Sequence, residues 1–170
     1  MKISIFGLGY VGAVSLACLV RDGHQVIGVD IDQTKLDLIT AGKTPVVEEG
    51  MVELMQLVAS SGRVHVTMSA EEAVLSSEIS LVCVGTPSAS NGSQDQGAIL
   101  RLAEQMGRAL GRKRVQGAEP HVVVFRSTLV PGTVEDVLRP IVERESRRIL
   151  RRRGELIISE TKQIGRASCR

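Results

Sequence analysis

Short apolar runs and an apolar stretch of helical length alternate along the first 30 residues. Apolar positions predict one strand at residues 3–6 and a second at residues 26–29, which stops on Asp30. Between them, an apolar stretch with helical character ends at Gly23. The pattern therefore predicts a strand–helix–strand unit at the start of the chain.

The same alternation continues after this unit. Asp32 and Ser69 are predicted helix N-caps, and Ser69 is followed three residues later by Glu72, as in a capping box. The strands at 79–84 and 121–125 are nearly continuous apolar runs, typical of strands buried on both faces of a parallel sheet. Residues 112–114 are predicted to be a basic connector. The remaining predicted elements are helices at residues 32–39, 51–58, 69–75, 99–110 and from 131 onward, and a strand at residues 64–67.

Strands that alternate with helices predict an α/β fold, a single domain with a Rossmann-type doubly wound parallel sheet. Ligands of such sheets bind outside the carboxyl ends of the strands. Three predicted strand ends carry groups suited to a ligand, namely Gly7–Gly12, Gly85-Thr86-Pro87 and Ser127-Thr128. We therefore expect a binding site where these three ends meet.

Gly7, Gly9 and Gly12 form the spacing G-x-G-x-x-G between the first strand and the first helix. Gly7 allows a tight turn, Gly9 lets the backbone approach a pyrophosphate, and Gly12 lets the helix lie close to the sheet. The start of the helix offers unpaired N–H groups to the phosphates. Asp30, 18 residues after Gly12, is placed to accept hydrogen bonds from the adenosine ribose hydroxyls.

This pattern predicts a dinucleotide site, and the alternative is a structural unit whose phosphate turn holds no ligand. The carboxylate of Asp30 would repel the 2′-phosphate of NADP, and Ile31 supplies no cation beside it, so the predicted cofactor is NAD. Lys35 is the nearby cation. It either faces the cofactor or lies solvated on the next helix, and the sequence leaves both interpretations open.

Charge is distributed unevenly along the 170 residues, whose formal net charge is +2. Residues 1–146 hold 13 Lys/Arg and 17 Asp/Glu, whereas residues 147–170 hold 8 Lys/Arg and 2 Asp/Glu. The basicity therefore belongs to the end of the chain, where a solvated helical face is the simple interpretation and a nucleic-acid-binding arm the alternative. Aromatic residues make up only 2% of the chain, which argues against base stacking, so no nucleic-acid partner is predicted.

Other bulk properties exclude several protein classes. No apolar run is long enough to span a membrane, and Met1-Lys2 leads directly into a strand rather than a signal-peptide segment. The three cysteines are not clustered, which argues against a disulfide framework or a zinc site. Cys18 and Cys83 are interpreted as small buried apolar residues. We expect a cytoplasmic protein with no membrane partner and no metal.

Several segments resemble the N-terminal NAD-binding domain of the UDP-glucose/GDP-mannose dehydrogenase family. The matching segments are F-G-L-G-Y-V-G (6–12), G-V-D-I-D (28–32), A-G-K-T-P-V-V-E-E-G (41–50), V-C-V-G-T-P (82–87), N-G-S-Q-D (91–95) and R-S-T-L-V-P-G-T (126–133). The resemblance covers residue 1 to about residue 146. G-L-G-Y-V-G-A-V and R-S-T-x-x-P-G-T-V are more similar to the GDP-mannose 6-dehydrogenase branch, and the UDP-glucose branch is the alternative.

The resemblance implies a role for individual residues. Thr86 and Thr128 would line the nicotinamide side, and Thr128 would also hold the water used in catalysis. For both threonines the alternative is a hydroxyl that satisfies a backbone group at a strand end. The implied cofactor-binding set is Gly7, Gly9, Tyr10, Val11, Gly12, Asp30, Lys35, Thr86 and Thr128.

The resemblance also implies a chemistry: a nucleotide-sugar C6 alcohol is oxidised to a carboxylate with two NAD⁺, for the synthesis of polysaccharides such as alginate. The family uses a downstream cysteine that forms a thiohemiacetal and then a thioester, and the complete protein is expected to be a homo-oligomer. The segment N-P-E-F-L-R-E does not follow residue 150, and the central helix, sugar domain and catalytic cysteine are not found. Cys169 does not lie in matching surroundings. The chain is therefore expected to bind NAD weakly at best and to be inactive alone.

Three segments are expected along the chain. Residues 1–146 are the NAD-binding domain, and residues 147–162 are a basic tail that is either native or frameshifted. Residues 163–170 are interpreted as translated sequencing adapter, because ATC GGA AGA GCG TCG TGT AGG encodes I-G-R-A-S-C-R. The predicted function is the NAD-binding fragment of a nucleotide-sugar 6-dehydrogenase, and the alternative is a free-standing NAD-sensing module without catalysis.

Overall fold

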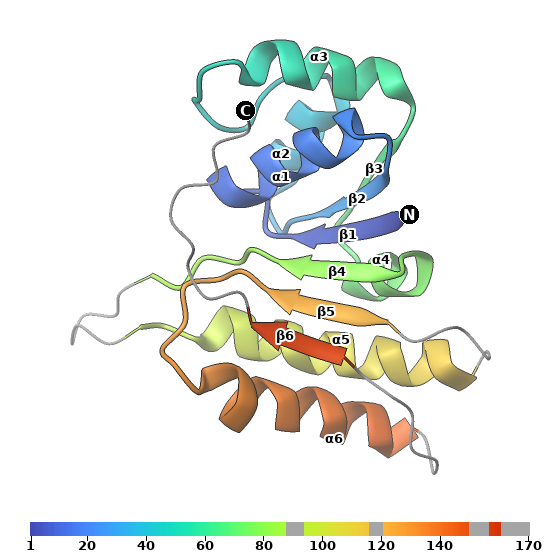
Figure 1. Cartoon of the computed structure of the whole chain (residues 1–170), viewed down its shortest axis with the longest axis vertical. Coiled ribbons are helices and arrows are strands. Elements are labelled where there is room, and N and C mark those ends of the chain that lie inside the picture. The colour runs from blue at the N-terminus through green and yellow to red at the C-terminus, as the bar shows by residue number, and fades with distance from the viewer. Residues whose placement is uncertain (88–93, 116–120, 150–156, 161–170) are drawn as a thin grey trace.

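The computed structural model describes residues 1–87, 94–115, 121–149 and 157–160 (Figure 1). Its centre is a six-stranded sheet in the order β3-β2-β1-β4-β5-β6, and every neighbouring pair is parallel. This is the strand order of a Rossmann sheet, so the predicted doubly wound fold is confirmed. The strands are β1 (Lys2–Phe6), β2 (Gln25–Val29), β3 (Val64–Thr67), β4 (Ile79–Val82), β5 (Val122–Phe125) and β6 (Ile157–Glu160).

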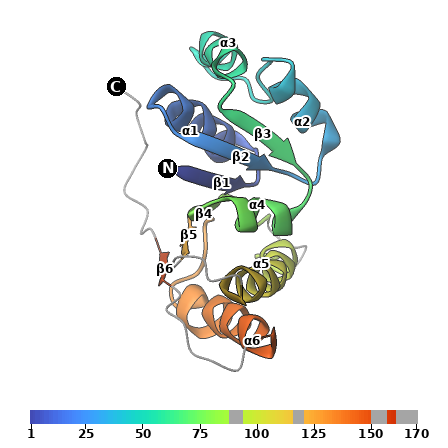
Figure 2. The same cartoon turned by 90° about the vertical axis from the view of Figure 1, so that its right-hand side faces the viewer.

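Helices cover both faces of the sheet, as Figure 2 shows. One face carries α1 (Tyr10–Arg21), α2 (Gln33–Thr40) and α3 (Met51–Ser61), and the other carries α4 (Ala70–Ser76), α5 (Gly97–Val115), η1 (Val134–Leu138) and α6 (Arg139–Ile149). Successive strand residues point to opposite faces, so Ile5 enters the core under α1 and Phe6 enters the core under α5. The buried sheet therefore separates two apolar cores and leaves its strand ends at the surface.

The predicted helix caps are partly confirmed. The Asp32 carboxylate accepts a hydrogen bond from the Thr34 amide at 3.0 Å, and the Ser69 hydroxyl accepts one from the Glu72 amide at 3.1 Å. The second half of the capping box does not form, because the Glu72 carboxylate instead accepts from the Thr67 hydroxyl and contacts His65. The Ser69 amide donates to Thr67 Oγ1 at 3.0 Å.

The predicted basic connector at residues 112–114 is wrong, because α5 continues to Val115. The Arg112 guanidinium pairs with Glu71 on α4, and the buried ammonium of Lys113 donates to backbone carbonyls at the end of that helix. Contacts with α4 therefore hold the last turn of α5. The periodicity of apolar residues alone did not indicate them.

Two further differences concern the last elements. The helix expected from Pro131 begins with a π-helical turn at Val134, and the Arg139 amide donates to the Val134 carbonyl. Pro140 follows at once and has no N–H for a normal helical bond, which accounts for a wider turn at this place. β6 was not predicted; it lies within residues 147–162 and pairs with β5. Residues 163–170, with Cys169, lie outside the described residues.

Candidate functional site

The turn between β1 and α1 is built from the three glycines of the predicted motif. Gly7 has a φ of 89°, and a Cβ there would lie 2.9 Å from the carbonyl oxygen of Cys83. A Cβ at Gly12 would lie 1.8 Å from the carbonyl oxygen of Gly7, so Gly12 allows α1 to approach the turn itself. A Cβ at Gly9 would meet no atom within 4 Å. Two of the glycines are thus required by packing, and the third leaves one side of the turn open.

The start of α1 faces this open side. Gly9 is the N-cap, no side chain caps the helix, and its first turn carries no acidic residue. The first N–H groups of a helix have no partner within the helix, and the helix dipole makes this end positive. Tyr10 and Val11 are exposed beside it. This arrangement is suited to an anionic phosphate.

Asp30 lies directly after β2 and is buried, with both carboxylate oxygens bound to backbone amides. Oδ2 accepts from the Leu8 amide at 2.7 Å, and Oδ1 accepts from the Asp32 amide at 3.0 Å. The carboxylate therefore ties the glycine turn to the end of β2, a structural role that the sequence did not indicate. An ionised carboxylate has about four acceptor positions, so it retains capacity for a ligand.

Lys35 lies on the side of α2 that faces Asp30. Its Nζ is 3.2 Å from Asp30 Oδ2, and its side chain is 33% exposed. The Lys35 side chain thus lies beside the Asp30 carboxylate. Asp30 and Lys35 offer an acceptor and donors side by side, which suits the neighbouring hydroxyls of a ribose.

A cavity of about 790 Å³ joins these groups at the carboxyl edge of the sheet. Ligand sites commonly enclose about 300–1,000 Å³. Gly12 is buried behind the turn and is not part of the cavity wall. The open turn, the helix start and the Asp30 carboxylate border one space, so these residues fit a dinucleotide. The predicted site residues in the wall are Gly7, Gly9, Tyr10, Val11, Asp30 and Lys35.

Thr86 and Thr128 are not among the residues that line this cavity. They meet beyond the ends of β4 and β5, where Thr86 Oγ1 donates to the carbonyl oxygen of Thr128 at 2.8 Å. The Gln94 side chain donates to the same carbonyl at 3.3 Å. The Thr86 hydroxyl thus satisfies a backbone group near a strand end, as in the alternative interpretation. The structure brings the two threonines together but does not place them beside Asp30.

Cys83 also lines the cavity, at the end of β4. Burial raises the pKa of its thiol to about 11, while the charge of the Arg126 guanidinium partly opposes this effect. The thiol is therefore protonated at neutral pH and is a poor nucleophile. Arg126 in turn donates to the Ser15 hydroxyl on α1 at 2.8 Å, a link between β5 and α1 that the sequence did not reveal.

One wall of the cavity was not predicted at all. Ala98, Arg101, Leu102 and Gln105 of α5 face the cavity, and Ile31 and Met68 lie at its rim. The α5 residues recur at the spacing i, i+3, i+4 and i+7, which places them on one helical face. This spacing was a signal in the sequence, but the apolar core face of the same helix overlaps it.

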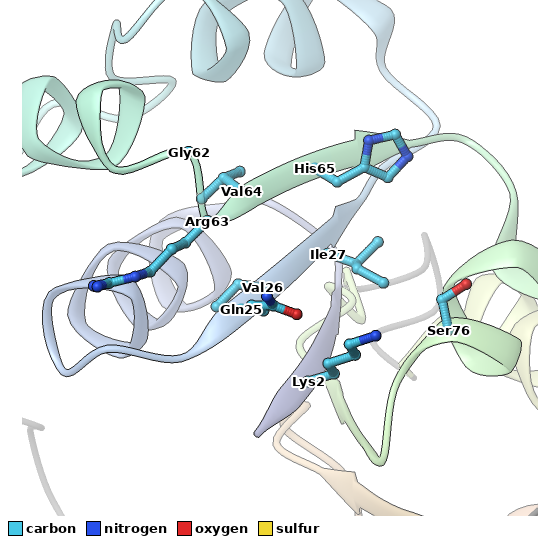
Figure 3. A pocket seen from close by; sticks show the side chains of 9 residues that line it. All are labelled: Lys2, Gln25, Val26, Ile27, Gly62, Arg63, Val64, His65 and Ser76. Atoms are coloured by element: carbon cyan, nitrogen blue, oxygen red, sulfur yellow. The ribbon is translucent and has the colours of Figure 1, made fainter.

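A smaller cavity of about 230 Å³ lies at the opposite, amino edge of β1, β2 and β3 (Figure 3). Three basic residues line it, namely Lys2, Arg63 and His65. Figure 3 shows the Arg63 side chain turned away from that of His65, so the basic groups do not converge on one point. Among the described residues, no three His, Cys, Asp or Glu side chains are grouped to hold a metal ion.

The helices in the described part of the chain are those of a sheet-covering α/β fold. None of them combines the length and the apolar character that a membrane crossing needs.

Comparison with known proteins gives a family match over most of the chain. Residues 1–159 match the model of the NAD binding domain of the UDP-glucose/GDP-mannose dehydrogenase family. GDP-mannose 6-dehydrogenase of Pseudomonas aeruginosa is 50% identical over 143 residues, which are 84% of this chain and 32% of that protein. UDP-glucose 6-dehydrogenase AglM of Haloferax volcanii is 37% identical over 146 residues, 86% of this chain and 33% of that protein.

A solved structure agrees with these matches. A ternary complex of GDP-mannose dehydrogenase from Pseudomonas aeruginosa superposes with a TM-score of 0.84 at 45% identity and covers 94% of this chain. This chain covers 35% of that structure, so it spans about a third of the length of the relatives it matches. The matched domain is an NAD binding domain, which confirms NAD as the predicted cofactor.

Proposed function

The chain belongs to the UDP-glucose/GDP-mannose dehydrogenase family, and on that premise we propose that it is the NAD-binding part of a nucleotide-sugar 6-dehydrogenase. GDP-mannose is the favoured substrate of the complete protein, because the GDP-mannose relative is 50% identical and the UDP-glucose relative 37%. The observation that carries the proposal is a glycine turn and a buried carboxylate that border one cavity. UDP-glucose remains the alternative substrate.

NAD, when bound, accepts the electron pair that leaves the sugar alcohol. In this proposal the amides at the start of α1 hold the pyrophosphate, and Gly9 leaves room for it. Tyr10 and Val11 cover the same end of the site. Gly7 and Gly12 act indirectly, because they permit the shape of the turn.

Asp30 and Lys35 would hold the adenosine ribose. Asp30 lies in position through the Leu8 and Asp32 amides, so its carboxylate needs no reorganisation when the ribose arrives. The same carboxylate would repel a 2′-phosphate, which explains a preference for NAD over NADP. The positive charge of Lys35 would reduce this repulsion. However, the Lys35 ammonium is already paired with the Asp30 carboxylate.

Thr86 and Thr128 are proposed at the nicotinamide side, near the ends of β4 and β5. The Thr86 hydroxyl donates to the Thr128 carbonyl, so the two residues lie next to each other. In this proposal the Thr128 hydroxyl holds the water molecule used in catalysis. This placement rests on the family resemblance and on the proximity of the two loops.

The complete protein would oxidise the C6 alcohol to a carboxylate for polysaccharide synthesis and would be a homo-oligomer. The thiol of Cys83, with its raised pKa, does not supply the nucleophile of that reaction. We therefore propose that the chain alone is inactive. Its proposed location is the cytoplasm, and no nucleic-acid partner is proposed.

The proposed segments are residues 1–146 as the NAD-binding domain, residues 147–162 as a basic segment, and residues 163–170 as translated adapter. The family match ends at residue 159 and β6 ends at Glu160, so both stop before the last segment. The basic segment contains β6, which extends the sheet beyond β5. Sequencing the native gene past residue 146 tests this division.

Calorimetric titration with NAD⁺ and NADP⁺ tests the cofactor site. Asp30→Asn is expected to weaken NAD⁺ binding about 10- to 100-fold, the effect of a lost hydrogen bond to a charged group. Asp30→Asn should also reduce the difference in affinity between NAD⁺ and NADP⁺, because it removes the charge that repels the 2′-phosphate. Asp37 is an exposed carboxylate on α2, so Asp37→Asn is the matched control. It should change neither the affinity for NAD⁺ nor the affinity for NADP⁺.

Two results would contradict the proposal. Equal affinity of the unaltered chain for NAD⁺ and NADP⁺ would contradict the role of Asp30. Turnover of GDP-mannose or UDP-glucose by the chain alone would contradict the proposed inactivity. A native gene that stops after residue 170 would favour the free-standing NAD-sensing module instead.

A further inference from the structure

α5 has two faces that meet different surroundings. Ile99, Ala103 and Met106 are fully buried in the core beneath the sheet. The adjacent face, with Arg101 and Gln105 at its exposed positions, forms a wall of the 790 Å³ cavity. A helix that needs only to pack against the sheet requires the first face alone. The second face is therefore available to a ligand.

Arg101 differs from the other α5 arginines whose side chains the structure describes. Arg108 pairs with Glu104 and Glu145, and Arg112 pairs with Glu71. Arg101 has no carboxylate within ion-pair distance among the described residues. Its guanidinium lies beside Gly97, where a Cβ would be 3.3 Å from Arg101 Nη1 and 3.1 Å from an oxygen of the Asp95 carboxylate.

The rim of the cavity carries two exposed apolar side chains. Ile31, the residue after Asp30, is 89% exposed, and Met68, just after β3, is 55% exposed. Both line the cavity together with Arg101. Apolar side chains beside a planar cation form surroundings that suit a flat aromatic ring, because such a ring is apolar at its faces and attracts cations there.

We propose that Arg101 binds the adenine of the cofactor by stacking its guanidinium on the purine face, with Ile31 as the apolar contact of the same ring. The inference rests on the proposed function, because Asp30 must first place the adenosine ribose beside Ile31. The guanidinium is planar and weakly hydrated, so it stacks on a ring better than a lysine ammonium does. Arg101 is thus a binding residue that adds affinity for the base rather than for the phosphates.

Calorimetric titration of the full chain with NAD⁺ and with AMP tests this inference. Arg101→Ala is expected to weaken both ligands about 3- to 10-fold, the effect of one partly exposed cation–π contact. Arg101→Lys should show a similar loss, because the charge remains but the plane does not. Arg63→Ala, which removes an exposed arginine at the amino edge of the sheet, is the matched control and should leave both affinities unchanged.

Salt concentration and NADP⁺ separate stacking from a charge contact. If Arg101 stacks on the adenine, the loss of affinity caused by Arg101→Ala is similar at low and high salt. A loss that vanishes at high salt, is restored by Arg101→Lys and is largest for NADP⁺ would identify a phosphate contact and overturn the inference. Thermal unfolding of each variant checks that the exposed substitutions leave the fold intact.

The failure of this inference is distinguishable from the failure of the proposed function. If Asp30→Asn weakens NAD⁺ and Arg101→Ala does not, the cofactor site stands and the role of Arg101 is wrong. If the unaltered chain binds neither NAD⁺ nor AMP at millimolar concentration, the proposed function itself is wrong, and this inference falls with it.

Discussion

Polar side chains have different roles at the two edges of the sheet. At the carboxyl edge, backbone amides bind Asp30 and Lys35 pairs with it, and both residues still border an open cavity. Toward the amino edge, Ser4 of β1, Ser80 of β4 and His121, the residue before β5, bind one another in the interior. The same fold therefore uses polar groups for a ligand at one edge and for internal structure at the other.

The internal cluster joins residues that are distant in sequence. Ser4 and Ser80 are register partners on β1 and β4, and their hydroxyls are 2.8 Å apart. Ser80 Oγ is 2.8 Å from His121 Nε2, and Lys113 Nζ is 3.0 Å from His121 Nδ1. His121 Nδ1 also lies 3.1 Å from the carbonyl oxygen of Ser77, so an ammonium donor and a carbonyl acceptor both face this nitrogen.

The largest expected effect is on stability and differs between two glycines of the turn at the carboxyl edge. Gly12→Val should destabilise the protein by about 3 kcal/mol or more, since its side chain would overlap the Gly7 carbonyl and force the turn to move. Gly9→Ala meets no neighbour and should cost less than about 1 kcal/mol, as expected for an N-cap change from glycine. Denaturant unfolding measures both changes.

For NAD⁺ binding, the important glycine is Gly9, whose substitution costs less stability than that of Gly12. Gly9→Ala places a methyl group where the phosphates approach, so it should weaken NAD⁺ at least about tenfold, or about 1.4 kcal/mol, while the fold persists. A Gly9→Ala protein that binds NAD⁺ normally would show that this side of the turn does not face the cofactor.

The next effect belongs to the amino edge and depends on pH. Burial and the charge of Lys113 lower the pKa of His121 to about 4 in the folded protein, against 6.5 when unfolded. The unfolded chain therefore binds more protons between these values, so stability is complete above pH 6.5 and falls as the pH drops toward 4. The loss is on the order of 3 kcal/mol at most, from 1.36 kcal/mol per unit of pKa.

Denaturant unfolding at pH 7 and pH 4.5 measures this loss. His121→Asn keeps a polar group next to Ser80 but cannot take up a proton, so its stability should depend less on pH in this window. A His121→Asn protein with the same acid sensitivity as the unaltered chain would assign the effect to other groups.

The fold was predictable from the sequence because its signals are local. Apolar runs such as those around Ile5 and Val82 define buried strands, and glycines and caps mark the element ends. The glycine turn and Asp30 were predictable for the same reason, since strand, turn, helix and acid follow one another within 30 residues. These features depend on spacing along the chain.

What the sequence did not reveal depends on contacts between distant segments. The wall formed by Arg101 shares its helix with a core face, so its periodicity is hidden by the apolar one. Lys113 was predicted to be a basic connector residue, yet its ammonium is buried, where it donates to carbonyls at the end of α4 and lies 3.0 Å from His121 Nδ1. No local pattern marks partners that are brought together only by the sheet.

The smallest expected effect concerns an exposed cluster that, like the buried one, contains a histidine and a hydroxyl group. His65 Nε2 lies 2.9 Å from a Glu72 oxygen, and the Thr67 hydroxyl donates to the other oxygen, which lowers the pKa of the Glu72 carboxyl. The side chains of His65 and Glu72 are about half exposed or more, so water competes for every one of these bonds. Glu72→Gln should therefore change the free energy of unfolding by less than about 1 kcal/mol, measured at pH 7. A loss as large as that of the His121 cluster in acid would show that burial does not set the difference between the two clusters.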